Sequence, residues 1–182
     1  MSNILVTGGA GYIGSHVVEQ LIDSKKKVFI IDNLSTGHRK LINKKAKFFF
    51  GDITKYKDVD FLISKNKISS IIHLAASLSV NESERKPKKY QINNVEGTKN
   101  LVKAALKNKV NNFIFSSTCA VYKDKLKIVS ESSKLLPKSV YGKTKLKGEN
   151  LIKSFFKEKK TKFAILRYFN VAGASKSKMI GQ

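Results

Sequence analysis

The sequence predicts an α/β fold, a doubly wound parallel sheet covered by helices on both faces. Three observations support this prediction. Six short apolar runs rich in β-branched and aromatic residues recur along the 182 residues, stretches long enough for helices separate them, and Pro87 and Pro137 are the only prolines. Parallel strands need long crossover connections, and strands covered on both faces are continuously apolar. The long spacing and the apolar runs therefore both indicate a parallel sheet with helices on its two faces.

The predicted strands share Ile, Val, Leu and Phe side chains, which suit burial in a sheet. In chain order they are Ile4–Val6, Val28–Ile31, Phe48–Phe50, Ile71–Leu74, Phe113–Phe115 and Phe163–Leu166. The segments between them have helical period, and no low-complexity linker interrupts them. We therefore expect residues 1–182 to form one domain, within the usual range of roughly 100 to 200 residues.

The charge balance is strongly basic, which raises the question of nucleic-acid binding. Lys and Arg number 36 against 13 Asp and Glu, for a net charge of +23. Only three of the basic residues are Arg, and the Lys residues are scattered along the chain. Base recognition favours Arg, and no cluster of interleaved aromatic and basic residues offers a stacking platform. We expect a solvated Lys surface with weak, salt-sensitive attraction to polyanions and no specific nucleic-acid partner.

The sequence shows no feature of a membrane or secreted protein. Its longest apolar stretch, Ile71–Ala76, is far shorter than the ~20 residues that span a bilayer. Met1 and Ser2 lead into a predicted strand instead of a signal peptide. Cys119 is the only cysteine, so no internal disulfide can form. We expect a soluble cytoplasmic protein in a reducing compartment, with no membrane partner and with Cys119 as a small buried residue instead of a nucleophile.

A glycine-rich turn follows the first predicted strand. Gly8, Gly11 and Gly14 are three residues apart, and a helix is expected to begin at about Gly11. Such glycines allow a tight turn, close approach of a pyrophosphate and close helix packing, while the helix N-terminus directs N–H groups at the phosphates. Asp32 follows at the end of the second strand. A carboxylate there accepts hydrogen bonds from the adenosine ribose and repels the 2′-phosphate of NADP, so the pattern predicts a Rossmann-like domain that binds NAD.

Asp52 ends the third predicted strand, and two roles remain open for it. Its carboxylate is placed either to meet an adenine amino group or to cap the N-terminus of the next helix. The sequence favours neither role over the other.

Tyr141 and Lys145 form a Y-x-x-x-K pair one helical turn apart. The same helical face continues through Gly148, Ile152 and Phe155, so we expect the pair to point inwards. A cation beside a phenol lowers the phenol pKa towards a value useful for acid/base catalysis. An inward-facing Lys145 would therefore assist proton transfer by Tyr141. Together with the glycine turn, the pair predicts a catalytic site.

The fifth predicted strand ends in the hydroxyl residues Ser116–Thr118. They lie at the carboxyl end of the sheet, where ligands bind in open α/β folds. Thr118 is placed to hydrogen bond a substrate oxygen beside Tyr141, with an ordinary strand-to-loop turn as the alternative. No metal site is predicted, because no Cys or carboxylate cluster accompanies the histidines at positions His16, His38 and His73.

Eight strings of the sequence match one family in the family's own order, and they span nearly the whole chain. They are TGGAGYIGSH (7–16), DNLSTG (32–37), GDI (51–53), IIHLAA (71–76), NNVEGT (93–98), FIFSSTCAVY (113–122), VYGKTK (140–145) and LRYFNVAGA (166–174). On these strings the chain resembles the extended short-chain dehydrogenases/reductases, and most closely the UDP-glucose 4-epimerase (UDP-galactose 4-epimerase) family.

The resemblance implies an NAD site and a catalytic triad. Thr118, Tyr141 and Lys145 would be the triad, and Asn170 would reach the sugar nucleotide together with Thr118 and Tyr141. Besides the triad, the residues implied to bind NAD are Gly8, Gly11, Tyr12, Ile13, Gly14, Asp32, Asn33, Leu34, Ser35, Thr36, Gly37, Asp52, Ile53, Leu74, Ala75, Ala76, Leu78, Asn94 and Phe169.

The resemblance also implies a reaction, epimerisation at C4 of a UDP-hexose, UDP-glucose or UDP-galactose. Tyr141, as a phenolate stabilised by Lys145, removes the proton of the sugar 4-hydroxyl while hydride leaves C4 for NAD. The 4-keto sugar then takes the hydride back on its other face. A non-catalytic NAD-binding remnant, or another enzyme of this family acting on a nucleotide-sugar, remains an alternative. The oligomeric state stays open, a homodimer included.

Three features bear on the resemblance, and the last two are departures from the family pattern. Cys119 and Ala120 follow Thr118 where related dehydratases and decarboxylases carry acidic residues, which favours epimerisation or carbonyl reduction. Leu78 stands where many epimerases have a Lys near the cofactor phosphates. Members of the family are much longer, so the sequence corresponds to the N-terminal, cofactor-binding portion, without the C-terminal substrate domain.

Overall fold

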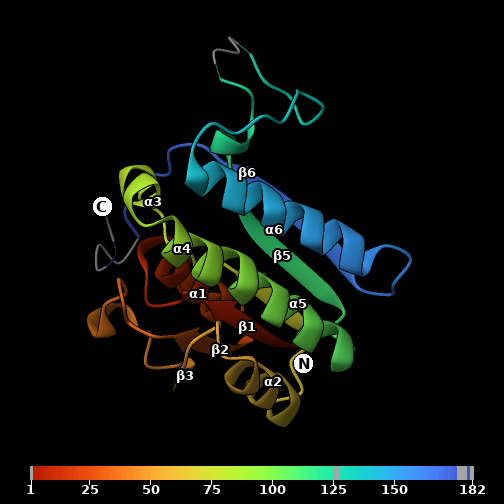
Figure 1. Cartoon of the computed structure of the whole chain (residues 1–182). Coiled ribbons are helices and arrows are strands. Elements are labelled where there is room, and N and C mark those ends of the chain that lie inside the picture. The colour runs from red at the N-terminus through yellow and green to blue at the C-terminus, as the bar shows by residue number, and fades with distance from the viewer. Residues whose placement is uncertain (1, 125–127, 176–179, 181–182) are drawn as a thin grey trace.

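The computed structural model describes residues 2–124, 128–175 and 180 (Figure 1). Met1, used above in the argument on signal peptides, lies outside these residues. The elements in chain order are β1 (Asn3–Thr7), α1 (Tyr12–Asp23), β2 (Lys27–Asp32), η1 (Arg39–Leu41), β3 (Lys47–Phe50), α2 (Tyr56–Lys65), β4 (Ser70–His73), α3 (Val80–Arg85), α4 (Pro87–Tyr90), η2 (Gln91–Glu96), α5 (Gly97–Lys107), β5 (Asn112–Thr118), η3 (Cys119–Val121), α6 (Val140–Phe156) and β6 (Lys162–Tyr168).

The strands form one parallel sheet in the order β3-β2-β1-β4-β5-β6. All six predicted strands are present, and the doubly wound α/β prediction is confirmed. β5 continues through Thr118, three residues past its predicted end, because Ser116–Thr118 pair with Leu166–Tyr168 of β6. The chain first builds the sheet outwards from β1 to β3 and then returns to the other side of β1, so the strand order reverses between β1 and β4.

Two apolar layers hold the sheet and its helices together. Leu5 and Phe29 contribute to the larger layer, which packs under α2, α5 and α6, while Val6 and Ile30 point to the opposite face and pack with α1. Successive strand residues face opposite sides, which is why a continuous apolar run serves both layers. Figure 1 shows α5 and α6 side by side over the larger layer. Within the described residues, no helix combines the length and the apolarity needed to cross a membrane.

The crossover between β4 and β5 contains a widened helical turn. Pro87 begins α4 at a position where its missing N–H costs nothing, and the helix runs on through η2 into α5. η2 has π-helical hydrogen bonding over Gln91–Glu96, which displaces the residues after it relative to a regular α-helix. Such turns concentrate at functional sites, and this one faces the carboxyl end of the sheet through Asn93.

Candidate active site

A cavity of about 410 Å³ opens at the carboxyl ends of the strands, at the reversal between β1 and β4. This is the position at which ligands bind in doubly wound sheets, because the diverging crossovers leave a crevice there. Nineteen predicted site residues line it: Gly8, Gly11, Tyr12, Ile13, Gly14, Asp32, Asn33, Ser35, Thr36, Gly37, Ile53, Leu74, Ala75, Ala76, Leu78, Thr118, Tyr141, Phe169 and Asn170. The fold therefore brings both the glycine turn and the Thr118–Tyr141 pair to one space.

Four predicted site residues, Leu34, Asp52, Asn94 and Lys145, are not among the lining residues. Asn94 is buried, and its side-chain oxygen accepts a hydrogen bond from Ser77 N (2.8 Å). Its Nδ2 donates to Ser77 O (3.0 Å) and to Thr144 Oγ1 (3.2 Å). Asn94 thus joins the loop after β4 to α6 from behind the cavity wall, while its neighbour Asn93 lines the cavity.

The cavity has further lining residues that are not among the predicted site residues, although Ser116 and Ser117 were expected at the carboxyl end of the sheet. They are Ile31, Gly51, Asn93, Ser116, Ser117, Tyr168 and Val171. Each is adjacent to a strand end or to a predicted site residue. The rule that ligands meet the carboxyl ends of parallel strands, applied strand by strand, would have found most of them.

The turn after β1 requires glycine at two positions. Gly8 has a φ of +72°, and a Cβ there would lie 2.7 Å from Ala75 N in the loop after β4. A Cβ on Gly14 would overlap the carbonyl oxygen of Gly8. Gly11 caps α1 without a side-chain hydrogen bond, and the first turn of α1 carries no acidic residue. The first-turn N–H groups are therefore placed to bind an anion.

Asp32 ends β2 with its carboxylate held by backbone donors. Oδ2 accepts from Ala10 N (3.0 Å) and Oδ1 from Leu34 N (2.8 Å). Leu34, the second of these donors, itself adopts a left-handed φ of +57°. Each carboxylate oxygen has a second lone pair, so the oriented group keeps the capacity to accept from a ribose diol.

Asp52 does not cap the next helix, so that alternative is wrong. α2 begins at Tyr56 with Lys55 as its cap, because Asp52 instead closes a tight turn. Its Oδ1 accepts from Thr54 N and Thr54 Oγ1 (2.8 Å each), and its Oδ2 accepts from Asn33 Nδ2 (3.1 Å). Burial raises the pKa of Asp52, but these hydrogen bonds outweigh it and leave the pKa below its ordinary value.

Tyr141 and Lys145 lie on the inward face of α6, as predicted. Ser139 caps this helix by accepting from Gly142 N (3.0 Å), and Ser83 Oγ of α3 accepts from Tyr141 N (3.1 Å). Lys145 is 3% exposed, and its Nζ lies 4.5 Å from the ring centroid of Phe115. The inward stripe continues through the buried Gly148 and Ile152. At the end of the stripe the buried residue is Phe156, whereas Phe155, which was predicted there, is only partly buried.

The electrostatics of this pair differ from the prediction. Burial raises the pKa of Tyr141, an effect opposed by the Thr118 hydroxyl and reinforced by Cys119. Burial also lowers the pKa of Lys145 to about 7, against a raising influence of Glu149. The expected net lowering of the phenol pKa is therefore wrong for this structure, because desolvation disfavours both charged forms and burial dominates at Tyr141.

Cys119 is half-buried, so the prediction of a buried thiol is wrong. It begins η3, where the chain leaves the sheet, and the preceding Thr118 accepts from Ala120 N through Oγ1 (3.2 Å). Thr118 itself lies at the cavity wall beside Tyr141. The Thr118 hydroxyl therefore stabilises the turn after β5 and also contributes to the cavity wall.

His73 links the glycine turn to the helix that carries Asn94. Thr7 Oγ1 accepts from both Leu74 N and Ala75 N (3.2 Å each), so its hydroxyl donates to His73 Nδ1 (2.8 Å). Thr98 Oγ1 donates to Asn94 O (2.6 Å), so it accepts from His73 Nε2 (2.9 Å). This assigns the neutral Nε2–H tautomer. Among the described residues, no group of three or more His, Cys, Asp or Glu is arranged to hold a metal ion.

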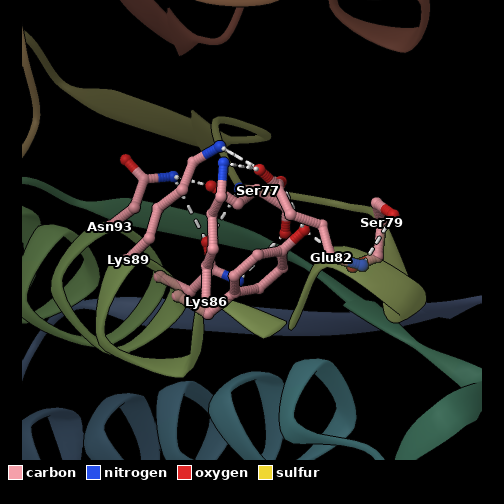
Figure 2. Close-up of polar contacts among 8 residues, drawn as sticks. Ser77, Ser79, Glu82, Lys86, Lys89 and Asn93 are labelled. Carbon is pink, nitrogen blue, oxygen red and sulfur yellow. Dashed lines mark hydrogen bonds and ion pairs between the residues drawn. The ribbon is translucent and has the colours of Figure 1, made fainter. Parts of the chain in front are cut away.

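A polar network at the start of α3 fixes the loop that forms one cavity wall (Figure 2). Glu82 accepts from Lys89 Nζ (2.9 Å) and pairs with Lys86 (3.6 Å), while Ser79 Oγ accepts from Glu82 N (3.1 Å). The buried Tyr90 hydroxyl donates to Ser79 O (2.7 Å). Burial, followed by the Glu82 charge, raises the pKa of Tyr90 to about 12, so this phenol remains a donor.

Comparisons with known proteins find relatives that match nearly the whole chain. A curated UDP-glucose 4-epimerase of Lactobacillus helveticus is 42% identical over 180 residues, covering 98% of this chain and 54% of that protein. The crystal structure of a Thermotoga maritima UDP-glucose 4-epimerase with UDP-glucose matches with a TM-score of 0.91 and 38% identity, over 94% of this chain and 57% of that one. The structure of the Brucella ovis enzyme in complex with NAD matches with a TM-score of 0.91 and 37% identity, over 96% and 54%.

The chain thus spans about half the length of the curated relatives it matches. The family model described as the NAD dependent epimerase/dehydratase family matches residues 4–181, nearly the whole sequence. With the glycine turn, Asp32 and Tyr141 around one cavity and Lys145 buried on the same helix, the match leads to one conclusion. This chain belongs to the NAD dependent epimerase/dehydratase family.

Proposed function

We propose that this chain is the NAD-binding portion of a UDP-hexose 4-epimerase, which interconverts UDP-glucose and UDP-galactose. One observation carries the proposal: a single cavity joins the glycine turn and Asp32 to Thr118 and Tyr141, with Lys145 buried behind Tyr141. The similarity to UDP-glucose 4-epimerases over 98% of the chain supports the choice of substrate class.

The residues around the cavity fit a dinucleotide. The space above Gly11 and the uncapped first turn of α1 suit a pyrophosphate, and a Cβ on Gly11 would meet only Gly8 O, at 3.3 Å. The oriented carboxylate of Asp32 suits the ribose hydroxyls of NAD and disfavours the 2′-phosphate of NADP. NAD supplies the acceptor and donor of the sugar C4 hydride when it is bound.

The remaining chemistry belongs to the side chains of this chain. Tyr141 Oη takes the proton of the sugar 4-hydroxyl and later returns it, and the Thr118 hydroxyl orients that oxygen. Lys145 supplies the positive charge that makes the phenolate accessible once substrate and cofactor are in place. Asn170 and Phe169, which follow β6, close the cavity on the substrate side.

A second candidate is an NAD-binding module without turnover. It is favoured by the glycine turn and the oriented Asp32 carboxylate, which suit NAD without any contribution from the catalytic pair. Turnover of UDP-galactose to UDP-glucose separates the two candidates. The epimerase predicts conversion that Tyr141→Phe abolishes while NAD binding persists, whereas the module predicts binding of NAD with no conversion.

NAD binding itself is tested by calorimetric titration of the wild-type chain, Asp32→Ala and the control Asp23→Ala, which removes an exposed carboxylate at the end of α1. Wild type and Asp23→Ala should bind with saturation. Asp32→Ala should bind NAD at least about tenfold more weakly, the effect of one lost charged hydrogen bond, and should discriminate less against NADP. Equal NAD and NADP binding by wild type and Asp32→Ala would contradict the proposed cofactor site.

A further inference from the structure

Glu149 is a fully buried carboxylate whose contacts join three elements at the catalytic end of the sheet. Its Oε1 accepts from Ser117 Oγ of β5 (2.6 Å) and from Arg167 Nε of β6 (2.9 Å), and its Oε2 accepts from Arg167 Nη2 (2.8 Å). The side chain is 0% exposed, and that of Arg167 is 13% exposed. These bonds keep Glu149 ionised, since they lower its pKa against the raising effect of burial.

Glu149 lies one helical turn after Lys145 on α6, and both residues are buried. An i, i+4 spacing brings two side chains to the same part of the helix surface, with Cβ atoms about 5–6 Å apart. The ring of Phe115 lies 4.5 Å from Lys145 Nζ. The buried ammonium group thus lies against an aromatic ring and one helical turn from a fixed carboxylate, whose charge favours the protonated lysine.

Resting on the proposed function, we propose that Glu149 is a positioning residue for catalysis: fixed by Arg167 and Ser117, its charge keeps the buried Lys145 protonated behind Tyr141. A buried lysine without a nearby anion loses its proton because solvation of the charge is lost. Deprotonated Lys145 would not stabilise a Tyr141 phenolate. Glu149 therefore acts on the reaction only through Lys145.

Other ionisable groups near Lys145 do not replace Glu149. His73 of β4 stays neutral, its pKa lowered to about 3 by burial and by the charge of Lys145. Arg167 of β6 and Lys153 of α6 are cations that face Glu149. On the other elements packed against α6, Cys119 of η3 lies beside Tyr141, and Tyr90 of α4, a neutral phenol, meets the Tyr141 ring edge-on with 6.5 Å between centroids. Glu84 of α3 accepts from Val140 N at the N-terminus of α6, and Glu96 and Lys99 form a solvated ion pair at 3.6 Å.

The test is a pH titration of Lys145 by NMR in protein labelled with ¹³C at lysine Cε. The ring of Phe115 displaces the Lys145 resonance from those of the solvated lysines, and its absence from a Lys145→Met spectrum assigns it. The wild-type midpoint should lie near pH 7. In Glu149→Gln it should fall by roughly 1 pH unit or more, since a nearby opposite charge shifts a pKa by about 1–3 units.

Two matched variants separate charge from structure. Glu149→Asp retains the charge and should restore most of the midpoint, while Ser117→Ala removes the 2.6 Å hydrogen bond, keeps the carboxylate, and should leave the midpoint close to wild type. An unchanged midpoint in folded Glu149→Gln overturns the proposal. So does a Ser117→Ala midpoint that falls as far as that of Glu149→Gln, because the shift would then follow packing instead of charge.

A measurement on the wild-type chain keeps the test decisive if Glu149→Gln does not fold. Coupling between two charges is reciprocal, so the ¹³Cδ resonance of Glu149 should shift with the same midpoint as Lys145. A Glu149 resonance that stays constant through the Lys145 titration overturns the proposal. The titration needs neither NAD nor sugar. Absent turnover would contradict the epimerase assignment, whereas the titration would still show whether Glu149 affects the protonation of Lys145.

Discussion

Single residues at this site show how burial competes with charge. Lys145 and Tyr141 were expected to assist each other, yet the structure places both where desolvation disfavours their charged forms, with the pKa of Lys145 near 7 and that of Tyr141 raised. The pair becomes useful for proton transfer only when other charges offset the desolvation. Glu149 is one such charge within the chain.

At the residue scale, Gly14→Ala should lower the free energy of unfolding by about 1–3 kcal/mol and weaken NAD binding, because the new Cβ would overlap Gly8 O and displace the turn. Urea denaturation measures the first effect and calorimetric titration the second. Gly11→Ala is the control for the stability effect alone, since its Cβ would lie 3.3 Å from Gly8 O and meets no other atom within 4 Å. Equal stability of the two variants would contradict the predicted overlap.

At the element scale, the site depends on side chains that fix one element to another. His73 joins β1 to α5 through Thr7 and Thr98, Asn94 joins η2 to α6, and Ser83 of α3 holds the N-terminus of α6. These bonds are buried or partly buried, so removing one partner leaves the other unsatisfied. The elements around the cavity are thus held by polar contacts at the carboxyl end, above the apolar layers.

His73 makes this arrangement sensitive to acid. Its pKa is about 3 in the folded chain against 6.5 for the ordinary side chain, because burial and the Lys145 charge disfavour the imidazolium. Between these two values the unfolded chain binds more protons, so stability that is present above pH 6.5 is lost as the pH falls towards 3. At pH 5 the expected loss is about 2 kcal/mol.

Urea denaturation at pH 7 and pH 5 measures this loss. His73→Gln carries no imidazole, so its stability should fall less between the two pH values than that of wild type, by about 2 kcal/mol. His38→Gln, which changes an exposed histidine, should follow wild type. The prediction fails if His73→Gln and wild type lose the same stability on acidification.

At the scale of the whole molecule, we expect the net charge of +23 to lower stability. Like charges spread over a compact surface repel one another, and salt screens them. The melting temperature should therefore rise between about 10 mM and 150 mM NaCl, as the Debye length falls from roughly 30 Å to 8 Å. Differential scanning calorimetry over this range tests the effect.

The matched variant for the salt prediction reverses three exposed charges in one segment, Lys40→Glu, Lys44→Glu and Lys45→Glu. Each reversal lowers the net charge of the chain by 2. The melting temperature of the variant should therefore depend less on salt than that of wild type. A wild-type melting temperature that is constant or falls with added salt would show that repulsion between lysines is not a significant cost.

Much of the fold could be predicted because its signals are local. The apolar runs of β1 to β6 and the glycine spacing after β1 each lie within a few residues, and the structure confirms the strands and their parallel order. The ends of the strands were less predictable. Thr118 belongs to β5 because it pairs with Tyr168, some fifty residues away, a partner that no local pattern reveals.

The sequence by itself determined the doubly wound sheet, the glycine turn with Asp32 after it, and the placement of Tyr141 and Lys145 on one helical face, since periodicity and spacing are properties of the chain. Only the tertiary structure decided that Asn93 lines the cavity while Asn94 lies behind it, and that Glu149 is paired with Arg167 beside Lys145. The physical reason is that pairing and desolvation depend on which distant segments the crossovers bring together.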